Sequence, residues 1–371
     1  MKVIVLGAGL IGKTIASDLS NQYEVCCADF NPEALKELSE KNIKTQQCDF
    51  SNHAELSKTI EPYDLVIGAV PGYMGFSVIK TIINAGKNTV DISFFPENPL
   101  ALDKLAKEKG VTAVVDCGVA PGLCNLIAGY HNATSKLSFY ECLVGGLPTV
   151  REWPYEYKAV FSPIDVIEEY TRPARYVENG KLVTREALSD SEYINFDDIG
   201  TLEAFNTDGL RTLADTMPYV ENMKEKTLRF PGHIELMKVL RETGFFDKNE
   251  IEFNGTKISP LAFTSKLLFP KWKLNRGQED FTIMRVKVKN ENGEFVYTLN
   301  DKYDKLNNVT SMARTTAYTC TAVADLVLKG NYSKKGISPP EFVGADEKCF
   351  KEVIQYLKKR KVELNTNINY N

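Results

Sequence analysis

Three glycines near the start of the chain are spaced as in a dinucleotide-binding turn. Gly7, Gly9 and Gly12 follow the apolar run 3–6, which is typical of a buried parallel strand. In such a turn the first glycine makes the bend, the second lets a pyrophosphate approach the backbone, and the third lets the next helix pack on the strand. The helix N-terminus then offers N–H groups and a positive dipole to the phosphates. We expect Leu10 and Ile11 of this loop to contact the cofactor as well.

A carboxylate ends the second apolar run, residues 23–29. Asp29 lies about 20 residues beyond the glycines, where this kind of turn places the group that bonds the adenine-side ribose. A carboxylate there repels a 2′-phosphate, and no arginine that could clamp such a phosphate precedes Arg151. Both observations favour NAD over NADP. Asp29 can also cap the helix expected from Pro32, and the two roles can coexist.

Apolar runs and helical patterns alternate through the first part of the chain. This alternation predicts a parallel sheet with helices on both faces, and ligands of such sheets bind beyond the carboxyl ends of the strands. The expected elements are helix 32–41, strand 43–47, helix 52–60, strand 64–69, strand 88–91 and strand 111–115. Residues after the strands are therefore expected to line the cofactor site, namely Asp49, Phe50, Ala69, Val70, Pro71, Ile92 and Val119.

Four side chains are candidates for catalysis. Asp91 and Asp116 end neighbouring expected strands, and two such carboxylates can act as acid and base if their environments separate their pKa values. Either can instead cap the turn that follows it. Tyr73 follows a Pro-Gly turn, where it would overhang the cofactor or cover the hinge. His233 follows another Pro-Gly pair at an expected helix start, where a neutral imidazole can act as a base or be structural.

From about residue 135 onward, the hydrophobic pattern becomes that of β-hairpins. Turn signals at Asn179-Gly180 and Asn292-Gly293, with a helix ending at Gly244, predict an α+β unit on a mainly antiparallel sheet. The fold class is thus α/β, a Rossmann-type doubly wound sheet followed by an α+β domain. We expect a cofactor domain at 1–124, a substrate and oligomerisation domain at 125–309, and helices at 310–371 that return to the first domain.

The second part of the chain contains every arginine, and guanidinium groups are what an anionic substrate group requires. Arg211 and Arg229 lie beside glycine turns, where loops project. Arg314 lies in the small-residue helix expected at 310–326, which can also serve only to join the domains. We count these three arginines as candidate substrate ligands, although most arginines lie on protein surfaces.

Composition excludes several classes of function. The net charge of −4, with acidic and basic residues interspersed, argues against a nucleic-acid partner. No apolar run approaches the roughly 20 residues of a membrane helix. A first strand that begins at Val3 leaves no room for a signal peptide, so a cytoplasmic protein is expected. Three histidines and eight scattered cysteines without a C-x-x-C pair predict no metal site and buried thiols rather than disulfides.

Several segments together resemble the saccharopine dehydrogenase superfamily, and within it the lysine 6-dehydrogenase branch. They match in order and nearly end to end: Gly-Ala-Gly-Leu-Ile-Gly at 7–12, Asp-x-Gly-Val-Ala-Pro-Gly at 116–122, Gly-Gly-x-Pro at 145–148, Tyr-Lys-x-Val-Phe-Ser at 157–162, Leu-Glu-Ala-Phe at 202–205, Lys-Thr-x-Arg-x-x-Gly-His at 226–233 and Met-Ala-Arg-Thr-Thr-Ala-Tyr-Thr at 312–319.

This resemblance implies NAD-dependent oxidative deamination of the ε-amino group of lysine, giving 2-aminoadipate 6-semialdehyde and ammonia, by a homodimer or higher homo-oligomer. Asp91, Asp116 and His233 would then be tested for proton transfer, and Arg211 would bind the α-carboxylate of the amino-acid substrate. One segment departs from the pattern: 207–213 reads Thr-Asp-Gly-Leu-Arg-Thr-Leu, where some lysine dehydrogenases have an uncharged loop.

Two other functions fit the same residues. A saccharopine-type reductase handles three carboxylates and would use several arginines, for which Arg172, Arg175, Arg211 and Arg229 are available. A non-catalytic NAD-binding protein can also be built on this fold, because fold alone does not determine function.

Overall fold

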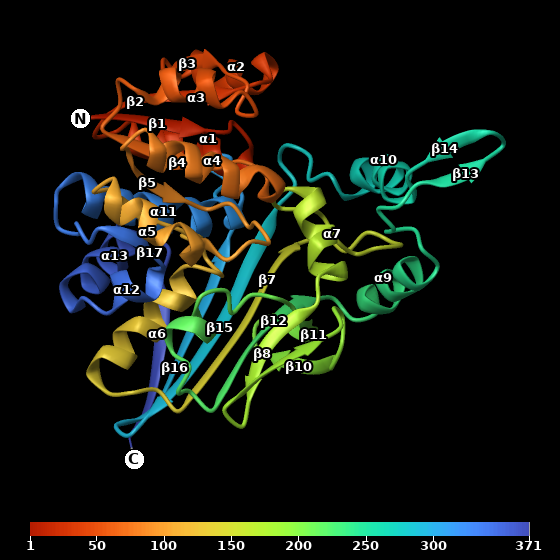
Figure 1. The fold of residues 1–371 in the computed structure, drawn as a ribbon. Coiled ribbons are helices and arrows are strands. Elements are labelled where there is room, and N and C mark those ends of the chain that lie inside the picture. The colour runs from red at the N-terminus through yellow and green to blue at the C-terminus, as the bar shows by residue number, and fades with distance from the viewer. Residues whose placement is uncertain (371) are drawn as a thin grey trace.

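The first third of the chain, with one strand from near its end, forms a parallel sheet covered by helices on both faces. The computed structural model describes residues 1–370, and Figure 1 shows this sheet with its helices at the N-terminal end of the molecule. Its strands run in the order β17-β6-β5-β4-β1-β2-β3, and every pairing is parallel. They are β1 (Lys2–Leu6), β2 (Glu24–Asp29), β3 (Lys44–Gln47), β4 (Leu65–Gly68), β5 (Asn88–Asp91), β6 (Thr112–Val114) and β17 (Gly336–Ser338).

The two faces of β1 contact different helices because successive side chains of a strand point in opposite directions. Ile4 and Leu6 pack with α3 and α4, whereas Val3 and Val5 pack with α1, α2 and the later helix α11. The helices are α1 (Leu10–Leu19), α2 (Pro32–Glu40), α3 (His53–Ile60), α4 (Gly72–Asn84) and α5 (Asp103–Glu108). The expected doubly wound sheet is therefore confirmed, with a topological switch point between β1 and β4.

A second, mixed sheet follows, in the order β10-β11-β12-β7-β15-β16-β18, with β8 beside β12 and β9 beside β8. Only the pairing of β12 with β7 is parallel among the described residues, so the expected antiparallel character is confirmed. The strands are β7 (Phe139–Pro148), β8 (Ala174–Glu178), β9 (Lys181–Arg185), β10 (Glu192–Phe196), β11 (Gly200–Asn206), β12 (Asn222–Arg229), β15 (Asp280–Asn290), β16 (Gly293–Lys302) and β18 (Leu364–Tyr370).

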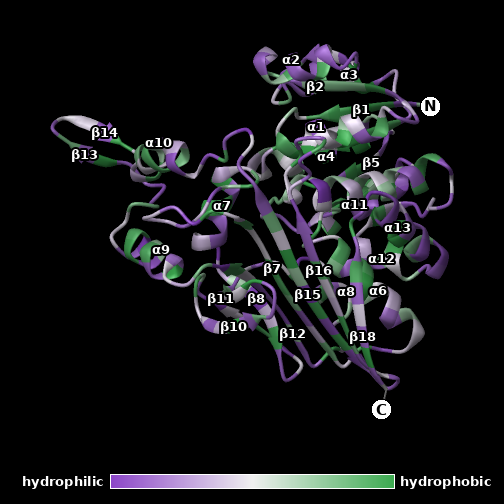
Figure 2. Cartoon of the chain, turned by 180° about the vertical axis from the view of Figure 1, so that it is seen from behind, coloured by the Kyte–Doolittle hydropathy of each residue, from purple (hydrophilic) through white to green (hydrophobic). Residues whose placement is uncertain are grey.

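Helices flank this second sheet, and a small arm projects from it. The helices are α6 (Leu123–Thr134), α7 (Pro163–Thr171), α8 (Leu213–Thr216), α9 (His233–Glu242) and α10 (Pro260–Trp272). The arm consists of α10 with the hairpin β13 (Ile251–Phe253) and β14 (Thr256–Ile258), and it extends away from the rest of the chain in both views (Figure 1, Figure 2). Figure 2 also shows hydrophobic residues, in green, along the buried strands β1 and β2.

The last part of the chain packs on the first domain. Helix α11 (Ser311–Leu328) lies on α1, and Asp18 of α1 accepts hydrogen bonds from Thr321 Oγ1 at 2.6 Å and Arg360 Nε at 2.7 Å. The helices α12 (Pro340–Gly344) and α13 (Glu347–Lys359) follow. Two strands were not expected here. β17 extends the parallel sheet beside β6, and β18 pairs antiparallel with β16 of the second sheet.

The cysteines agree with the expectation from the sequence. All eight cysteines fall within the described part of the chain, and each is buried and unpaired, so the expectation of buried thiols is confirmed. Across residues 1–370, no helix has the length and apolar character needed to cross a bilayer.

Candidate active site

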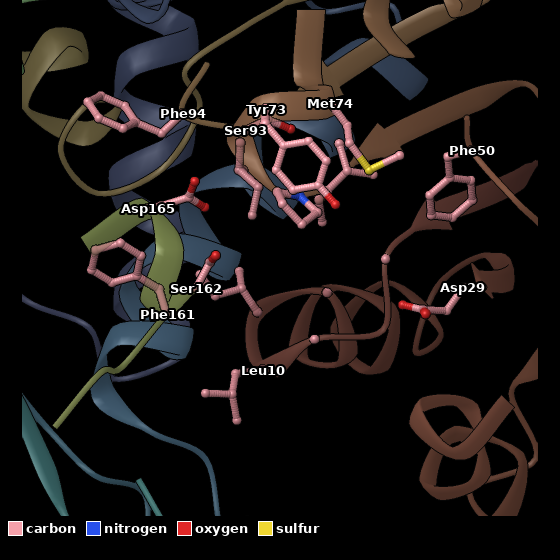
Figure 3. Close-up of a pocket in the computed structure, with 18 of the residues that line it drawn as sticks. Leu10, Asp29, Phe50, Tyr73, Met74, Ser93, Phe94, Phe161, Ser162 and Asp165 are labelled. Carbon is pink, nitrogen blue, oxygen red and sulfur yellow. The ribbon is translucent and has the colours of Figure 1, made fainter. Parts of the chain in front are cut away.

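A cavity of about 650 Å³ lies beyond the carboxyl ends of β1, β2, β4 and β5. All residues predicted to bind the cofactor line it except Val119. Figure 3 shows Asp29 at one end of this larger cavity and Phe94, Phe161 and Asp165 at the other, with Tyr73 and Met74 along one side. Tyr73 is 75% exposed and lines the cavity from the first turn of α4.

The glycine loop has the geometry that a bound pyrophosphate needs. Gly7 has φ +111°, and a Cβ on Gly12 would come within 2.0 Å of the Gly7 carbonyl oxygen. By contrast, a Cβ on Gly9 would meet no described atom within 4 Å. Gly9 is the N-cap of α1 and has no side chain to bond the first N–H groups of that helix. The loop is therefore tightly packed where the chain turns and open where phosphate oxygens would bind.

Asp29 is held rigidly at the end of β2. Its Oδ2 accepts the N–H of Ala8 in the glycine loop at 2.7 Å, and its Oδ1 accepts the N–H of Asn31 at 2.8 Å. The alternative role for Asp29 as a helix cap was wrong, because the cap of α2 is Asn31, whose side chain accepts the N–H of Glu33. Asp49 is likewise engaged, since its Oδ1 accepts the N–H and the hydroxyl of Ser51.

A smaller cavity of about 130 Å³ adjoins the first. Ile11, Ile92, Phe94 and Phe161 line both cavities, so the two meet at an apolar junction. Val119 lines the smaller cavity, not the larger one. Of the described residues that line the smaller cavity, four carry carboxylates and two carry guanidinium groups: Glu168, Glu169, Asp208, Glu225, Arg172 and Arg229. The smaller cavity thus carries more acidic than basic side chains within a largely apolar lining, and its junction with the cofactor site is apolar.

The arginines of this region differ in how their donors are used. Arg229 lines the smaller cavity, and its Nη2 lies 2.6 Å from Glu169 Oε2. Arg175 donates to Asp208 from Nε at 2.8 Å. Arg172 is only partly engaged: its Nη2 lies 3.7 Å from Glu168 Oε2 and its guanidinium lies over the ring of Phe94 at 4.6 Å, whereas its Nε and Nη1 have no hydrogen-bond partner among the described residues. The guanidinium available to a substrate carboxylate is therefore that of Arg172.

The predicted pair of catalytic aspartates does not line either cavity. Asp91 is buried, and its two carboxylate oxygens accept the N–H and the hydroxyl of Ser93 at 2.8 and 3.0 Å. Burial raises the pKa of Asp91 well above its ordinary value. Asp116 is buried against Arg211; burial raises the pKa of Asp116, and the Arg211 guanidinium opposes that change. Asp91 therefore caps its turn, and Arg211 is committed to Asp116 rather than to a substrate in the cavities.

His233 is enclosed behind Arg229. Its Nδ1 lies 2.8 Å from the carbonyl oxygen of Tyr155, so Nδ1 must carry the proton, and Nε2 accepts from the hydroxyl of Tyr170 at 2.9 Å. That hydroxyl in turn accepts from Arg229 Nε. Burial and then the charge of Arg229 lower the pKa of His233 to about 3. Both ring nitrogens are used, so the contacts make His233 a positioning residue for Arg229.

The expectation that Arg314 faces the cleft was wrong. Its Nε bonds Asp301 at 3.1 Å, its Nη1 bonds Asp304 at 3.1 Å, and its Nη2 donates to the carbonyls that follow α13. From the same helix, Met312 and Thr316 line the smaller cavity instead. Arg314 therefore joins α11 to β16 and the C-terminal segment, through contacts that helical spacing alone did not reveal.

Sequence reasoning missed several cavity-lining carboxylates, among them Asp165 and Glu225. Asp165 lines the larger cavity near Phe161, and its Oδ1 accepts the N–H of Gly72 at 3.3 Å. Burial raises the pKa of Asp165 to about 6. Glu225 lines the smaller cavity from β12 and is 4% exposed. Its only signal in the sequence was a charged residue at an inward position of a strand.

Family models match most of the chain. Residues 3–114 match the saccharopine dehydrogenase NADP binding domain, and residues 118–362 match the saccharopine dehydrogenase C-terminal domain. The saccharopine dehydrogenase (NADP+, L-glutamate-forming) of Pyricularia oryzae is 26% identical over 72% of this chain and 62% of its own length. The mitochondrial alpha-aminoadipic semialdehyde synthase of Mus musculus is 25% identical over 72% of this chain and 31% of its own length.

Two further similarities complete the comparison. The carboxyaminopropylagmatine dehydrogenase of Synechocystis is 22% identical over 72% of each chain. The apo saccharopine dehydrogenase (L-Glu forming) of Saccharomyces cerevisiae has the same fold, with a TM-score of 0.80 and 19% identity over 99% of both chains. The chain spans less than two thirds of the fungal and mouse relatives. With a glycine loop, an adjoining charged cavity and family models that together match nearly all of it, the chain belongs to the saccharopine dehydrogenase family.

Proposed function

We propose that this chain is an NAD-dependent dehydrogenase that oxidatively removes the ε-amino group of L-lysine, giving 2-aminoadipate 6-semialdehyde and ammonia. One observation carries the proposal: Glu168, Glu169 and Asp208 of the smaller cavity are paired with cations, and Glu225 remains there as a buried carboxylate without a cationic partner among the described residues, next to the cofactor crevice. Such a cavity favours a substrate with two amines and one carboxylate, because unlike charges attract strongly where water is excluded. Arg172 supplies free donors for the single carboxylate.

Saccharopine fits this cavity less well. Its three carboxylates would lie among Glu168, Glu169, Asp208 and Glu225. The arginines that a reductase of this type would need are neutralised: Arg175 by Asp208, Arg211 by Asp116 and Arg229 by Glu169. The names of the fungal relatives nevertheless favour saccharopine as the second candidate substrate.

The cofactor preference is also part of the proposal. The matched domain model and the fungal relatives are named for NADP, whereas Asp29 at the end of β2 supports NAD. A carboxylate fixed there can accept hydrogen bonds from ribose hydroxyls and repel a 2′-phosphate. The glycine loop and the N-terminus of α1 would hold the pyrophosphate, and Tyr73 would cover the cavity from α4.

The chain's own side chains have two tasks in this reaction. When bound, the nicotinamide accepts a hydride from the carbon that carries the amine. Ile11, Ile92, Phe94 and Phe161 keep bulk water from the junction at which that carbon must lie. Asp165 serves as the proton acceptor for the water that adds to the substrate iminium before ammonia leaves.

The test is direct. Purified protein is incubated with NAD or NADP and with L-lysine or saccharopine, and absorbance of the reduced coenzyme and released ammonia are followed together. We expect reduced NAD and an equal amount of ammonia from lysine. Turnover of saccharopine without ammonia, or no turnover of lysine with either coenzyme, would contradict the proposal.

A further inference from the structure

Glu225 is a buried carboxylate that has no cationic partner. It lies on β12 directly opposite Cys142 of β7, and its carboxylate packs so closely on Gly209 that a Cβ there would meet it at 1.9 Å. Its Oε2 has no hydrogen-bond partner, and no lysine or arginine of residues 1–370 forms an ion pair with it. The other acidic residues of the smaller cavity each have a cationic partner: Glu168 pairs with Lys248, Glu169 with Arg229 and Asp208 with Arg175.

An unpaired buried carboxylate is unfavourable, so Glu225 must either take up a proton or gain a cationic partner. Burial raises the pKa of Glu225 well above its ordinary value; the charges of Cys124, Glu169 and Asp208 raise it further, and that of Arg211 opposes the change. Charged groups inside proteins are normally paired or bound to a cation, because desolvation of a lone ion costs several kcal/mol. Because Glu225 lines the smaller cavity, the missing charge can arrive with a ligand.

We infer that Glu225 binds the ammonium group of the substrate that does not react, which for lysine is the α-ammonium. The orientation rests on which residues line which cavity: Glu225 lines only the smaller one, whereas the reacting carbon must reach the apolar junction beside the cofactor. The amine at Glu225 is therefore the distant one. This inference deepens the proposed function and rests on it for the identity of the reacting end.

A metal ion is the competing occupant. One ligand atom from each of Cys124, Cys142 and Glu225 lies within 4.8 Å of the others, and all three residues are buried. Two thiols and a carboxylate can bind zinc. We favour the amine because Glu225 lines the cavity that also holds the free donors of Arg172, so a single amino acid can satisfy both orphaned groups. Metal content is included in the test.

The experiment compares Glu225→Gln with a matched control. The control is Glu141→Gln on β7: Glu141 lies opposite Lys224, one step along the same strand pair, and therefore on the other face of the sheet. Binding to each protein in the presence of NADH is measured by calorimetry for L-lysine, for L-norleucine, which lacks the ε-amine, and for 6-aminohexanoate, which lacks the α-amine. Melting temperatures check that both variants are folded.

We expect Glu225→Gln to weaken lysine and norleucine by about tenfold or more, the usual effect of losing a charge-assisted bond, and to leave 6-aminohexanoate within about twofold. Glu141→Gln should change none of the three. Unchanged lysine affinity in Glu225→Gln, or equal losses for norleucine and 6-aminohexanoate, would overturn the inference. So would one equivalent of bound zinc, by elemental analysis, that is lost in Glu225→Gln.

This experiment can contradict the proposed reaction without contradicting the ammonium site at Glu225, and the reverse. If lysine binds in a manner that depends on Glu225 but is not oxidised, the proposed reaction is wrong and the ammonium site stands. If lysine is oxidised at the ε-carbon and Glu225→Gln binds it normally, the reaction stands and the ammonium site is wrong.

Discussion

The Nε of Arg211 lies 3.0 Å from Oδ1 of Asp116, although 95 positions of sequence separate the two residues. The side chains are 3% and 1% exposed, respectively, and both backbones have φ +52°, the left-handed region that non-glycine residues seldom adopt. The pair joins the end of the parallel sheet to the loop before α8. Two residues to which sequence reasoning assigned a proton transfer and a substrate contact therefore neutralise each other.

This pair predicts a large energetic coupling. Asp116→Asn or Arg211→Gln alone leaves one buried charge without its partner, so each should lower the free energy of unfolding by about 3–5 kcal/mol. The double variant should be destabilised by clearly less than the sum of the two, as measured by urea unfolding. Additive effects would show that the contact contributes little. Lost turnover in a fully stable Asp116→Asn protein would return Asp116 to the chemistry.

Two glycines of the loop allow the effects on stability and on cofactor binding to be tested separately. Gly12→Ala should destabilise the protein, because the new methyl group would clash with the Gly7 carbonyl oxygen at 2.0 Å. Gly9→Ala should leave the melting temperature nearly unchanged, because the methyl group would enter open space. It should still weaken NADH binding, followed by fluorescence, by tenfold or more, or about 1.4 kcal/mol. Normal NADH affinity in Gly9→Ala would place the pyrophosphate elsewhere.

Asp29 should set the coenzyme preference. Asp29→Ser removes the charge that repels a 2′-phosphate, so the ratio of kcat/KM for NAD to that for NADP should fall by about tenfold. Asp49→Ser is the matched control, because Asp49 lines the same cavity and is predicted near the adenine that both coenzymes share. It should affect both coenzymes alike. An unchanged ratio in Asp29→Ser would remove the main support for NAD.

Asp165 should set the acidic limb of the pH profile of turnover. Burial raises its pKa to about 6, and a proton acceptor works only when ionised, so turnover should rise as the pH increases through about 6 and then level off. Asp165→Asn should lose that limb and about 10²–10⁴-fold of the rate. A variant that keeps the limb would identify another group as the acceptor.

His233 should affect stability at acid pH rather than the pH profile of turnover. Its pKa is about 3 when folded and about 6.5 when unfolded, so the unfolded chain takes up the proton first as the pH falls. The contribution of the neutral ring is thus complete above pH 6.5 and is lost progressively below it. The stability gap between wild type and His233→Gln should narrow by about 1.4 kcal/mol per pH unit below about pH 6. Urea unfolding at several pH values measures the gap, and a constant or widening gap would contradict the buried neutral ring.

The cofactor side of the molecule was largely predictable. The six strands that begin the parallel sheet, β1 to β6, begin and end within a residue or two of the expected positions, because short apolar runs bounded by turns are a local signal. Residues that follow such strands meet at one edge of the sheet, so the cavity lining from Gly7 to Ile92 could be inferred without coordinates. Strands β17 and β18 were missed because each pairs with a strand distant in sequence.

By itself, then, the sequence determined the doubly wound sheet, the glycine loop, Asp29 at the end of β2 and the family likeness, all of which depend on spacing between near neighbours. Only the tertiary structure decided which charged groups keep atoms that no neighbouring side chain binds. Arg211, Arg229 and Arg314 were all candidate substrate ligands in the sequence, yet each forms a close ion pair with a carboxylate, whereas Arg172 and Glu225, which line the smaller cavity, keep polar atoms without a partner among the described residues. The physical reason is that the availability of a charge depends on its neighbours in space, and those neighbours come from distant parts of the chain.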